Sequence, residues 1–409
     1  MLDVVVVGAG LAGLSAAGVL SLAGKNFEIW DSADQAGGRI RTNRHERGFL
    51  LDEGFALLNP AYPAAKRIFD YQALDLHAWE QGTVAAHTGS DGRLRSLTLA
   101  TPLGHAGALK QAMKVLGPKD ALALAKLVAK PPQTKTLGQA LAEAGLNPAL
   151  EQIVRRFLSG VVADPDLGCT ATFGASLLRF FALGKPSLPA QGMGALVAQL
   201  TAKLAQPVKS RRRVEALRLH PEGVELDFVD VNEHGQAGET QTVSAKQVIL
   251  AAGPKASANL LGLEAPQMGS LRTWWFATPT LPTDSRMLHL DCDDDSPINH
   301  TAVVSNVCPS YAPAGWHLVE VTAVGAEPTD RFLAAEEVAA RAASMMGAEA
   351  DDWELLTYQN IANALPRVTG SELAVDSPHL VLAGDTAHAS INGALESGER
   401  AAARVLERL

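Results

Sequence analysis

Cysteine is scarce in this 409-residue sequence, which contains Cys169, Cys292 and Cys308. Their spacing matches neither a disulfide framework nor a zinc site, so we expect a reducing compartment and no bound metal. No uncharged apolar stretch reaches about 18 residues, so no membrane-spanning helix is predicted. A predicted strand begins at residue 2 and leaves no room for a signal peptide, and we therefore expect a cytoplasmic protein.

Basic residues are too few for a nucleic-acid-binding protein. The sequence has 35 Lys and Arg against 44 Asp and Glu, a net charge of -9, which argues against a nucleic-acid partner. No Ser-His-Asp set or metal-ligand cluster stands out. We interpret the acidic run of Asp291, Asp293, Asp294 and Asp295 as a solvated loop. The length suits two domains, and 47% hydrophobic residues suffice for two cores.

A glycine-rich turn opens the chain in the stretch DVVVVGAGLAGL, residues 3–14. The valines predict a strand buried on both faces. Gly8 allows a tight turn, Gly10 lets the backbone approach a ligand, and Gly13 lets the next helix pack against the strand. That helix is predicted over 11–23, beginning with Leu11 and Ala12. Its N-terminus favours an anion such as pyrophosphate.

A second predicted strand, 26–30, ends at Asp31, where an acid can bind a ribose hydroxyl. Ser32 follows, and then Gly37, Gly38 and Arg39, which suit a close approach to phosphate. Strand, helix, strand and acid together predict a dinucleotide site. The alternative is a glycine-rich turn that serves only close packing, but such a turn would not need Asp31 at the end of the second strand.

Here the sequence resembles the flavin-dependent family of amine oxidases, protoporphyrinogen oxidases and carotenoid (phytoene) desaturases. The family opening is Gly-x-Gly-x-x-Gly, an acid, then Gly-Gly-Arg-x-x-Thr, which Thr42 completes. Asp31 stands where the family more often has Glu. The resemblance implies FAD as the cofactor. We expect it to be bound non-covalently, because no cysteine lies in the C-terminal flavin motif.

The C-terminal stretch resembles the same family. A strand over 379–383 precedes Gly384 and Asp385, and a helix is predicted to begin near Asn392. The resemblance places Asp385 on the linker of FAD and the helix N-terminus, Gly393 and Ala394, facing the flavin. Such an N-terminus stabilises the charge of reduced flavin. Ser397 belongs to the same helix.

Two middle segments complete the expected cofactor site. The resemblance gives Val214 a backbone contact with adenine, and it places the turn with Gly54 and Phe55 near the flavin. An ordinary hairpin turn is the alternative at Gly54. The predicted fold class is α/β, a Rossmann-like FAD-binding domain of the glutathione-reductase-like type with an interleaved α+β substrate domain. The FAD-binding domain is assigned to 1–75, 186–262 and 351–409, and the substrate domain to 76–185 and 263–350.

The substrate segments are predicted from hydrophobic patterning. Residues 76–185 read as mostly helical. Strands are expected around 274–277, 286–290, 302–307 and 317–324, followed by a helix over 334–346.

The expected chemistry follows partly from absences. Amine-oxidising relatives usually carry a lysine near the flavin and an aromatic residue before the final helix. This chain has no lysine after Lys255, and the stretch before the final helix has His388 and no aromatic residue. We therefore expect dehydrogenation of a C–C or ring C–H bond in an apolar, carotenoid- or porphyrinogen-like substrate.

His388 is the candidate catalytic residue, since histidine can relay protons near neutral pH. A hydrogen bond to a loop carbonyl is the alternative role. A flavin amine oxidase, a non-catalytic FAD-binding scaffold and a nicotinamide dehydrogenase remain alternatives for the function. Segments 61–70 and 308–318 resemble bacterial desaturase-like FAD oxidoreductases.

A basic amphipathic segment spans residues 109–130, within an acidic protein. It carries Lys110, Lys114, Lys119, Lys126 and Lys130 against one acid, Asp120. Such helices can lie on an anionic bilayer, which predicts peripheral contact with the inner membrane face. Packing on their own domain is the alternative.

Overall fold

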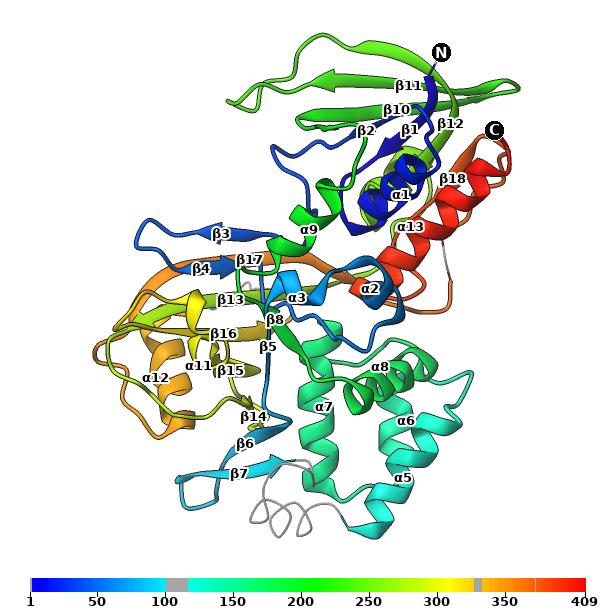
Figure 1. The fold of residues 1–409 in the computed structure, drawn as a ribbon. Coiled ribbons are helices and arrows are strands. Elements are labelled where there is room, and N and C mark those ends of the chain that lie inside the picture. Colours follow the sequence, from blue (N-terminus) through cyan, green and yellow to red (C-terminus); the bar gives the residue numbers. More distant parts are fainter. Residues whose placement is uncertain (1, 101–116, 327–332, 372) are drawn as a thin grey trace.

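The computed structural model describes residues 2–100, 117–326, 333–371 and 373–409. Its first large sheet holds both ends of the chain (Figure 1). The strand order is β10-β11-β12-β1-β2-β9, and β18 pairs with β12. β12 pairs in parallel with β1 and β18, and β1 pairs in parallel with β2, which confirms the predicted α/β class with a Rossmann-like sheet. These strands are β1 (Leu2–Val7), β2 (Phe27–Trp30), β9 (Val208–Lys209), β10 (Arg212–His220), β11 (Gly223–Asp230), β12 (Gln241–Leu250) and β18 (Leu380–Leu382).

Two helices from opposite ends of the sequence pack against each other on this sheet (Figure 1). They are α1 (Leu11–Leu22) and α13 (Ile391–Leu406). The contact is close because Gly398 has no Cβ: one added there would lie 2.1 Å from the Ala12 carbonyl oxygen. The Ser15 hydroxyl also donates to the Leu395 carbonyl at 2.9 Å. The two glycine motifs are therefore brought together by helix packing.

A second large sheet has the order β17-β13-β16-β15-β14-β6-β7. Helix α12 (Ala335–Met346) covers one face, where Trp274, Phe276 and Val321 pack with Val338 and Ala342. We call the opposite side the inner face; strand register places Gln359, Thr273, Trp275, Glu320, Thr322 and His300 on it. The strands are β6 (Gly82–Thr88), β7 (Leu94–Ala100), β13 (Met268–Thr278), β14 (Leu288–Asp291), β15 (His300–Val303), β16 (His317–Val324) and β17 (Glu354–Pro366).

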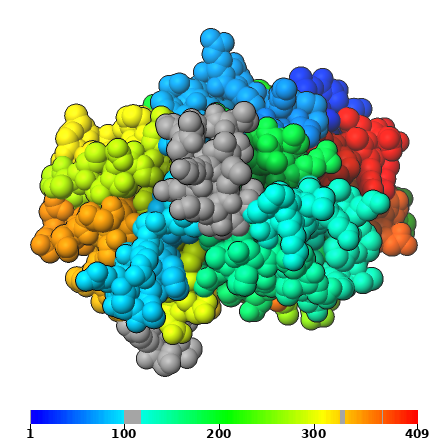
Figure 2. Space-filling view, turned by 90° about the horizontal axis from the view of Figure 1, so that it is seen from below, coloured from blue at the N-terminus to red at the C-terminus, as the bar shows by residue number. Residues whose placement is uncertain are grey.

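A group of helices with its own apolar core lies beside this sheet (Figure 1). It contains α5 (Pro118–Ala129), α6 (Leu137–Glu143), α7 (Pro148–Val162) and α8 (Ala171–Leu183). α7 contacts β14 and β16. Figure 2 shows these helices next to β6 and β7 on the lower side of the molecule. No helix of the described ranges is long and apolar enough to cross a membrane.

Short elements connect these units. They are β3 (Thr42–Arg44), β4 (Leu50–Asp52), β5 (Leu76–Ala78), β8 (Ser187–Pro189), α2 (Pro63–Ile68), α3 (Tyr71–Leu74), α9 (Gly194–Thr201), α10 (Pro254–Leu261), α11 (Val304–Val307) and a 3-10 turn, η1 (Pro309–Tyr311).

Two predictions of secondary structure need correction. Within 76–185, which is predicted to be mostly helical, residues 76–100 form β5, β6 and β7, because β6 and β7 extend the second sheet. The strand predicted over 302–307 ends at Val303, where α11 begins. β17 pairs with β13 in the second sheet, and the assignment of the two domains stays a prediction. Residues 109–116 of the predicted basic segment lie outside the described residues.

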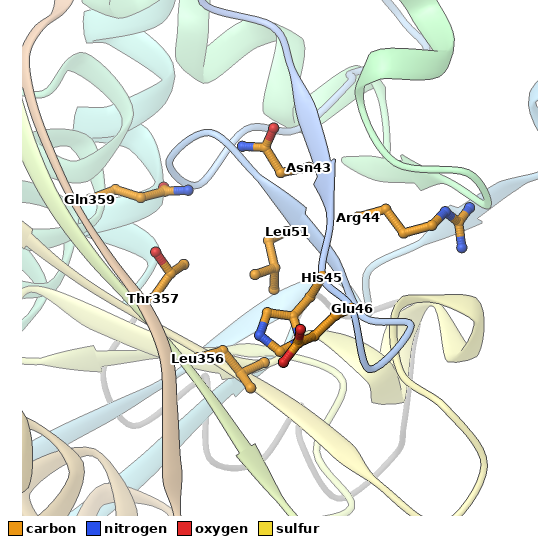
Figure 3. A pocket seen from close by; sticks show the side chains of 8 residues that line it. All are labelled: Asn43, Arg44, His45, Glu46, Leu51, Leu356, Thr357 and Gln359. Carbon is orange, nitrogen blue, oxygen red and sulfur yellow. The ribbon is translucent and has the colours of Figure 1, made fainter.

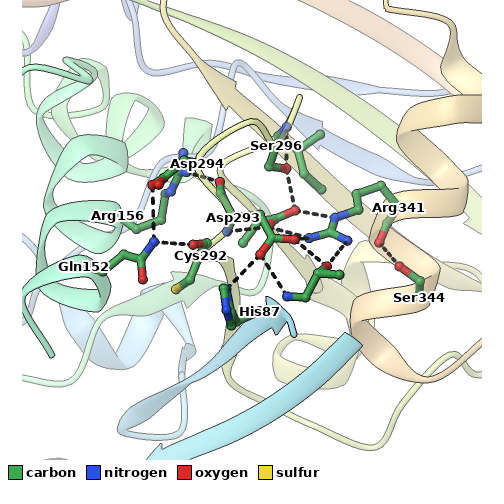
Figure 4. Close-up of polar contacts among 12 residues, drawn as sticks. His87, Gln152, Arg156, Cys292, Asp293, Asp294, Ser296, Arg341 and Ser344 are labelled. Carbon is green, nitrogen blue, oxygen red and sulfur yellow. Dashed lines mark hydrogen bonds and ion pairs between the residues drawn. The ribbon is translucent and has the colours of Figure 1, made fainter. Parts of the chain in front are cut away.

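The acidic run is not a solvated loop throughout (Figure 4). Asp291 is fully buried, and the Arg341 guanidinium donates to both of its carboxylate oxygens at 2.6 Å. Arg341 also donates to Asp293 at 2.8 Å, and His87 lies 2.9 Å from the same carboxylate. The run fastens α12 to β14 and β6, whereas Asp294 and Asp295 are exposed.

Candidate functional site

The turn after β1 is closely packed on one side and open on the other. Gly8 has a φ of +102°, and a Cβ on it would lie 2.3 Å from the Ala251 carbonyl oxygen. A Cβ on Gly13 would lie 1.8 Å from the Gly8 carbonyl oxygen. At Gly10 the nearest atom to such a Cβ is the Gly38 Cα at 3.9 Å. Open space therefore adjoins the N-terminus of α1, where Leu11 and Ala12 present unpaired backbone N–H groups to an anion.

Asp31 lies at the edge of this space. Its carboxylate accepts hydrogen bonds from the Ala9 N–H at 2.6 Å and the Ala33 N–H at 2.8 Å. The Gly37 N–H donates to the Ala9 carbonyl at 2.9 Å, which brings the second glycine pair against the first turn. A carboxylate oxygen accepts more than one hydrogen bond, so Asp31 retains lone pairs for a ribose hydroxyl. Ser32 is exposed beside it.

An ion pair joins the two distant motifs. Arg39 donates to Asp385 at 2.7 Å and to the Ala364 carbonyl at 3.0 Å. The Gly384 N–H donates to the Ser397 hydroxyl at 3.0 Å, which fastens the turn after β18 to α13. The Ser390 hydroxyl caps α13 by accepting from the Gly393 N–H at 3.0 Å. Ala394 follows in the first turn of this helix.

The structure thus brings the N-terminal and C-terminal candidate residues to one region of the first sheet. An open anion-binding helix end, a carboxylate with free lone pairs and an Arg–Asp pair fit the pyrophosphate and ribose of FAD. Val214 is buried on β10 opposite Phe228, and its adenine contact stays a prediction.

The turn at Gly54 connects the two sheets. The Gly54 N–H donates to the Gln359 side-chain oxygen at 2.8 Å, and the Gln359 amide donates to the Asp52 carbonyl at 3.1 Å. A Cβ on Gly54, whose φ is +69°, would lie 2.8 Å from Ile361 Cδ1. The half-buried Phe55 ring therefore projects from a fixed backbone and contacts the rings of Trp79 and His300.

Asp52 organises the base of this turn. Its buried carboxylate accepts from the Tyr311 hydroxyl at 2.8 Å, the Met193 N–H at 3.0 Å and the Thr42 hydroxyl. Thr42 also accepts from the Gly194 N–H at 2.8 Å. Burial raises the pKa of Asp52 to about 6, which the three donors partly oppose. The Thr of the family opening thus holds the backbone of a distant segment.

A hollow of about 420 Å³ adjoins the same turn (Figure 3). It lies between the β3–β4 hairpin and β17. Its lining is Asn43, Arg44, His45, Glu46, Leu51, Leu356, Thr357 and Gln359. Because Gln359 also holds Gly54, this hollow reaches the turn that the resemblance places near the flavin.

The inner face carries an acid and a base that the sequence analysis did not identify. His300 is 4% exposed and Glu320 is 0% exposed, and His300 Nε2 lies 3.7 Å from Glu320 Oε2. Burial lowers the pKa of His300 to about 3 and raises the pKa of Glu320 well above its ordinary value. Burial therefore favours the uncharged form of both groups. A sequence feature that could have identified Glu320 is the segment HLVEVTAV, residues 317–324, in which one acid interrupts an apolar strand pattern.

Three aromatic residues lie near this pair. The Phe55 ring lies 5.1 Å from the His300 ring and 5.6 Å from the Trp79 ring, between centroids. Trp275 stands opposite Glu320 across β13 and β16. Four buried polar atoms here have no hydrogen-bond partner among the described residues: Trp79 Nε1, Trp275 Nε1, His300 Nε2 and Glu320 Oε2. Each such atom costs about 1–3 kcal/mol.

His388 lies between α8 and the start of α13. Its Nε2 is 3.1 Å from the Ser176 hydroxyl, its Nδ1 is 2.9 Å from the Ser390 hydroxyl, and its ring meets Phe173 edge-on. Burial lowers its pKa. These contacts anchor the N-terminus of α13, and a catalytic role for His388 stays a prediction.

Comparison with known proteins agrees with this geometry. The sequence profile of the family described as flavin containing amine oxidoreductase matches residues 11–406. L-amino-acid oxidase of Gloydius halys is 47% identical over 57 residues, which are 14% of this chain and 10% of that protein. Amine oxidase [flavin-containing] A of Sus scrofa is 43% identical over 60 residues, 15% and 11% of the two chains. The matched segments thus span about a tenth of these relatives.

Solved structures of similar fold cover nearly the whole chain. An oxidoreductase from Methanosarcina mazei has a TM-score of 0.75 at 18% identity, covering 99% of this chain and 100% of that one. Putrescine oxidase bound to putrescine has a TM-score of 0.70 at 18% identity, with 99% coverage of each. A putative protoporphyrinogen oxidase from Exiguobacterium has a TM-score of 0.69 at 16% identity, again with 99% coverage of each. The chain belongs to the flavin-containing amine oxidoreductase family, and it is an oxidoreductase whose cofactor is FAD.

Proposed function

We propose that this FAD-dependent oxidoreductase dehydrogenates a C–C or ring C–H bond of an apolar, carotenoid- or porphyrinogen-like substrate. Bound FAD supplies the hydride acceptor. The observation that carries the proposal is the neutrality of the inner face. Its buried ionisable groups, His300 and Glu320, have pKa values that burial shifts towards the neutral form. An apolar molecule can lie against such a surface without leaving a charge unsolvated.

The uncharged polar groups of the inner face can orient a substrate. Thr273 and Thr322 lie 3.2 Å apart between their hydroxyl oxygens, and Gln359 is held by the Gly54 turn. Phe55, Trp79 and Trp275 contribute flat apolar surfaces. Fixing the substrate carbon next to the hydride acceptor is the contribution that such a site makes to the rate.

The test is anaerobic mixing of the purified yellow protein with candidate substrates while the flavin absorbance is followed. We expect polyenes or porphyrinogens to bleach the flavin. Simple primary and secondary amines should do so slowly or not at all, since the chain has no lysine after Lys255. Rapid bleaching by an amine would overturn this ranking.

Amine oxidation is the second candidate, and one observation favours it. Glu320 is a buried carboxyl group with Trp275 as its cross-strand neighbour, and a carboxylate with an aromatic ring can hold an ammonium ion through ionic and cation–π interactions. An amine substrate would have to keep Glu320 ionised. Absence of bleaching by every class, with FAD retained, would favour a non-catalytic scaffold.

We also propose that the surface of α5 makes the predicted peripheral membrane contact. Lys119, Lys126 and Lys130 are exposed, and Leu122 is 71% exposed between them along the chain. Leu127 is buried in the core of the helical group, so the helix uses part of its apolar face within the protein. An exposed leucine among lysines is the feature that an anionic bilayer would bind.

A further inference from the structure

Four buried polar atoms without partners among the described residues belong to side chains that are linked by one aromatic ring and one strand pair. Phe55 packs against both His300 and Trp79, while Trp275 and Glu320 are cross-strand neighbours. All four side chains that carry these atoms are more than nine-tenths buried. Native interiors rarely leave buried polar atoms without partners, so a cluster of four indicates a group that binds there.

The hydrogen-bonding chain behind His300 fixes which of its nitrogens carries the proton. The Ser159 hydroxyl donates to the Arg156 carbonyl at 2.9 Å, and the Asn299 amide donates to Ser159 at 2.8 Å. The Asn299 side-chain oxygen then accepts from His300 Nδ1 at 2.9 Å. His300 Nε2 is left with a lone pair that faces the inner side.

Glu320 is held in a complementary way. Its Oε1 accepts from the Thr322 hydroxyl, and its Oε2 faces His300 Nε2 across 3.7 Å. This separation is too long for a direct hydrogen bond, but one oxygen atom beside the pair can reach both. Trp79, linked to His300 through the Phe55 ring, and Trp275, the cross-strand neighbour of Glu320, each carry an Nε1–H donor that is unpaired within the described part of the chain. The set offers donors and an acceptor and no fixed charge.

We propose that His300, Glu320, Trp79 and Trp275 form a polar subsite that binds a neutral hydroxyl or carbonyl group of an otherwise apolar substrate. A hydroxyl oxygen donates one hydrogen bond and accepts two, which suits an acceptor nitrogen flanked by donors. Burial and the Thr322 hydroxyl account for the two pKa values, with no contribution from a charged side chain of the described residues. A neutral group is therefore favoured over an ion. This inference rests on the proposed function, whose substrate it specifies.

The experiment measures binding to the FAD-loaded protein, without turnover. Benzyl alcohol, benzylammonium and benzoate serve as neutral, cationic and anionic probes of similar size, and perturbation of the flavin absorbance gives their affinities. We expect benzyl alcohol to bind and both ions to bind at least about 10-fold more weakly. Trp79→Phe and His300→Gln each remove one polar partner and should weaken benzyl alcohol about 5–10-fold.

Matched controls lie on the α12-covered face of the same sheet. His289 is buried on β14 with its Nδ1 3.3 Å from the Met345 carbonyl, and Trp274 stacks on Tyr358. His289→Gln and Trp274→Phe should leave probe binding unchanged. Glu320→Gln keeps an uncharged side chain with a donor and an acceptor at the subsite, so it tests whether binding of any probe needs a carboxylate charge.

The outcomes separate the alternatives. Tighter binding of benzylammonium that Glu320→Gln abolishes would overturn the neutral subsite in favour of a cation site. The neutral subsite would also be overturned if no probe binds and Trp79→Phe is more heat-stable than the parent. That result would indicate that ordered water alone contacts the four unpaired atoms. If polyenes and porphyrinogens fail to reduce the flavin but benzyl alcohol binds as expected, the proposed reaction fails and the subsite stands.

Discussion

Three glycines of the first turn and helix allow the contact with FAD to be separated from the packing of the fold. At Gly13 an added Cβ would lie 1.8 Å from the Gly8 carbonyl oxygen, far inside van der Waals contact. Gly13→Ala should therefore destabilise the protein by at least about 1–3 kcal/mol. Gly18, in the same helix, has no atom within 4 Å of such a Cβ. Gly18→Ala should stabilise by about 0.5–1 kcal/mol through helix propensity.

Gly10 is the informative third position. Its Cβ would meet only Gly38 Cα, at 3.9 Å, and its φ of -74° suits alanine. Gly10→Ala should leave the FAD-free protein within about 0.5 kcal/mol of the parent. It should weaken FAD binding at least about 10-fold, which corresponds to about 1.4 kcal/mol, because the methyl group enters the space beside the helix N-terminus.

Denaturant unfolding of the FAD-free variants gives the first set of free energies, and fluorescence titration with FAD gives the second. Gly18→Ala controls for the effect of the methyl group itself and should bind FAD like the parent. If Gly10→Ala binds FAD with the parent affinity, the backbone does not approach the cofactor at this turn. If Gly13→Ala is as stable as Gly18→Ala, the strand–helix contact is not close.

Three further predictions test single groups. Asp31→Ala should weaken FAD binding by about 1.5–3 kcal/mol, measured by titration, because a charge-assisted hydrogen bond is lost; parent affinity in the variant would contradict the ribose contact. Acid denaturation of the parent should release all FAD, and FAD that stays with the protein would contradict non-covalent binding. For Asp52, a pKa raised from 3.8 to about 6 means that the protonated form stabilises the fold below about pH 4. That stability, about 3 kcal/mol, is lost as the pH rises to about 6, so urea unfolding of the parent but not of Asp52→Asn should show this loss. Anionic vesicles should co-sediment with the protein at low salt and release it when Lys119 and Lys126 become Glu, whereas no binding at low salt would mean that α5 is an ordinary surface helix.

The cofactor region was predictable because each of its motifs is local in sequence. The valine run, the spacing of Gly8, Gly10 and Gly13, and the acid that ends β2 report a strand, a turn and a ribose partner within about 30 residues. The C-terminal motif is equally compact. What sequence could not give is the Arg39–Asp385 pair, since a contact between residues at opposite ends of the chain depends on how α1 and α13 pack.

The substrate side was less predictable because its residues come from separate strands. His300, Glu320 and Trp275 belong to three strands, and only their register places them on one face. Alternation within one strand can reveal that a residue is buried, but not which residues of other strands lie beside it. The first part of this region was also misread as helical, because the strand character of β6 and β7 depends on pairing with each other and with β14, which is distant in sequence.

The Gly54 turn has a consequence for interpreting variants of either half of the site. Gln359 belongs to the second sheet, yet its amide holds both Gly54 and the Asp52 carbonyl. Asp52 in turn holds Tyr311 from the segment after β15 and Met193 from the segment before α9. A change in FAD binding that displaces this turn must therefore move Phe55, and with it the rings around His300. FAD content should consequently be measured for every inner-face variant. A lost substrate contact and a displaced turn would both weaken probe binding. Only the displaced turn would also weaken the binding of FAD.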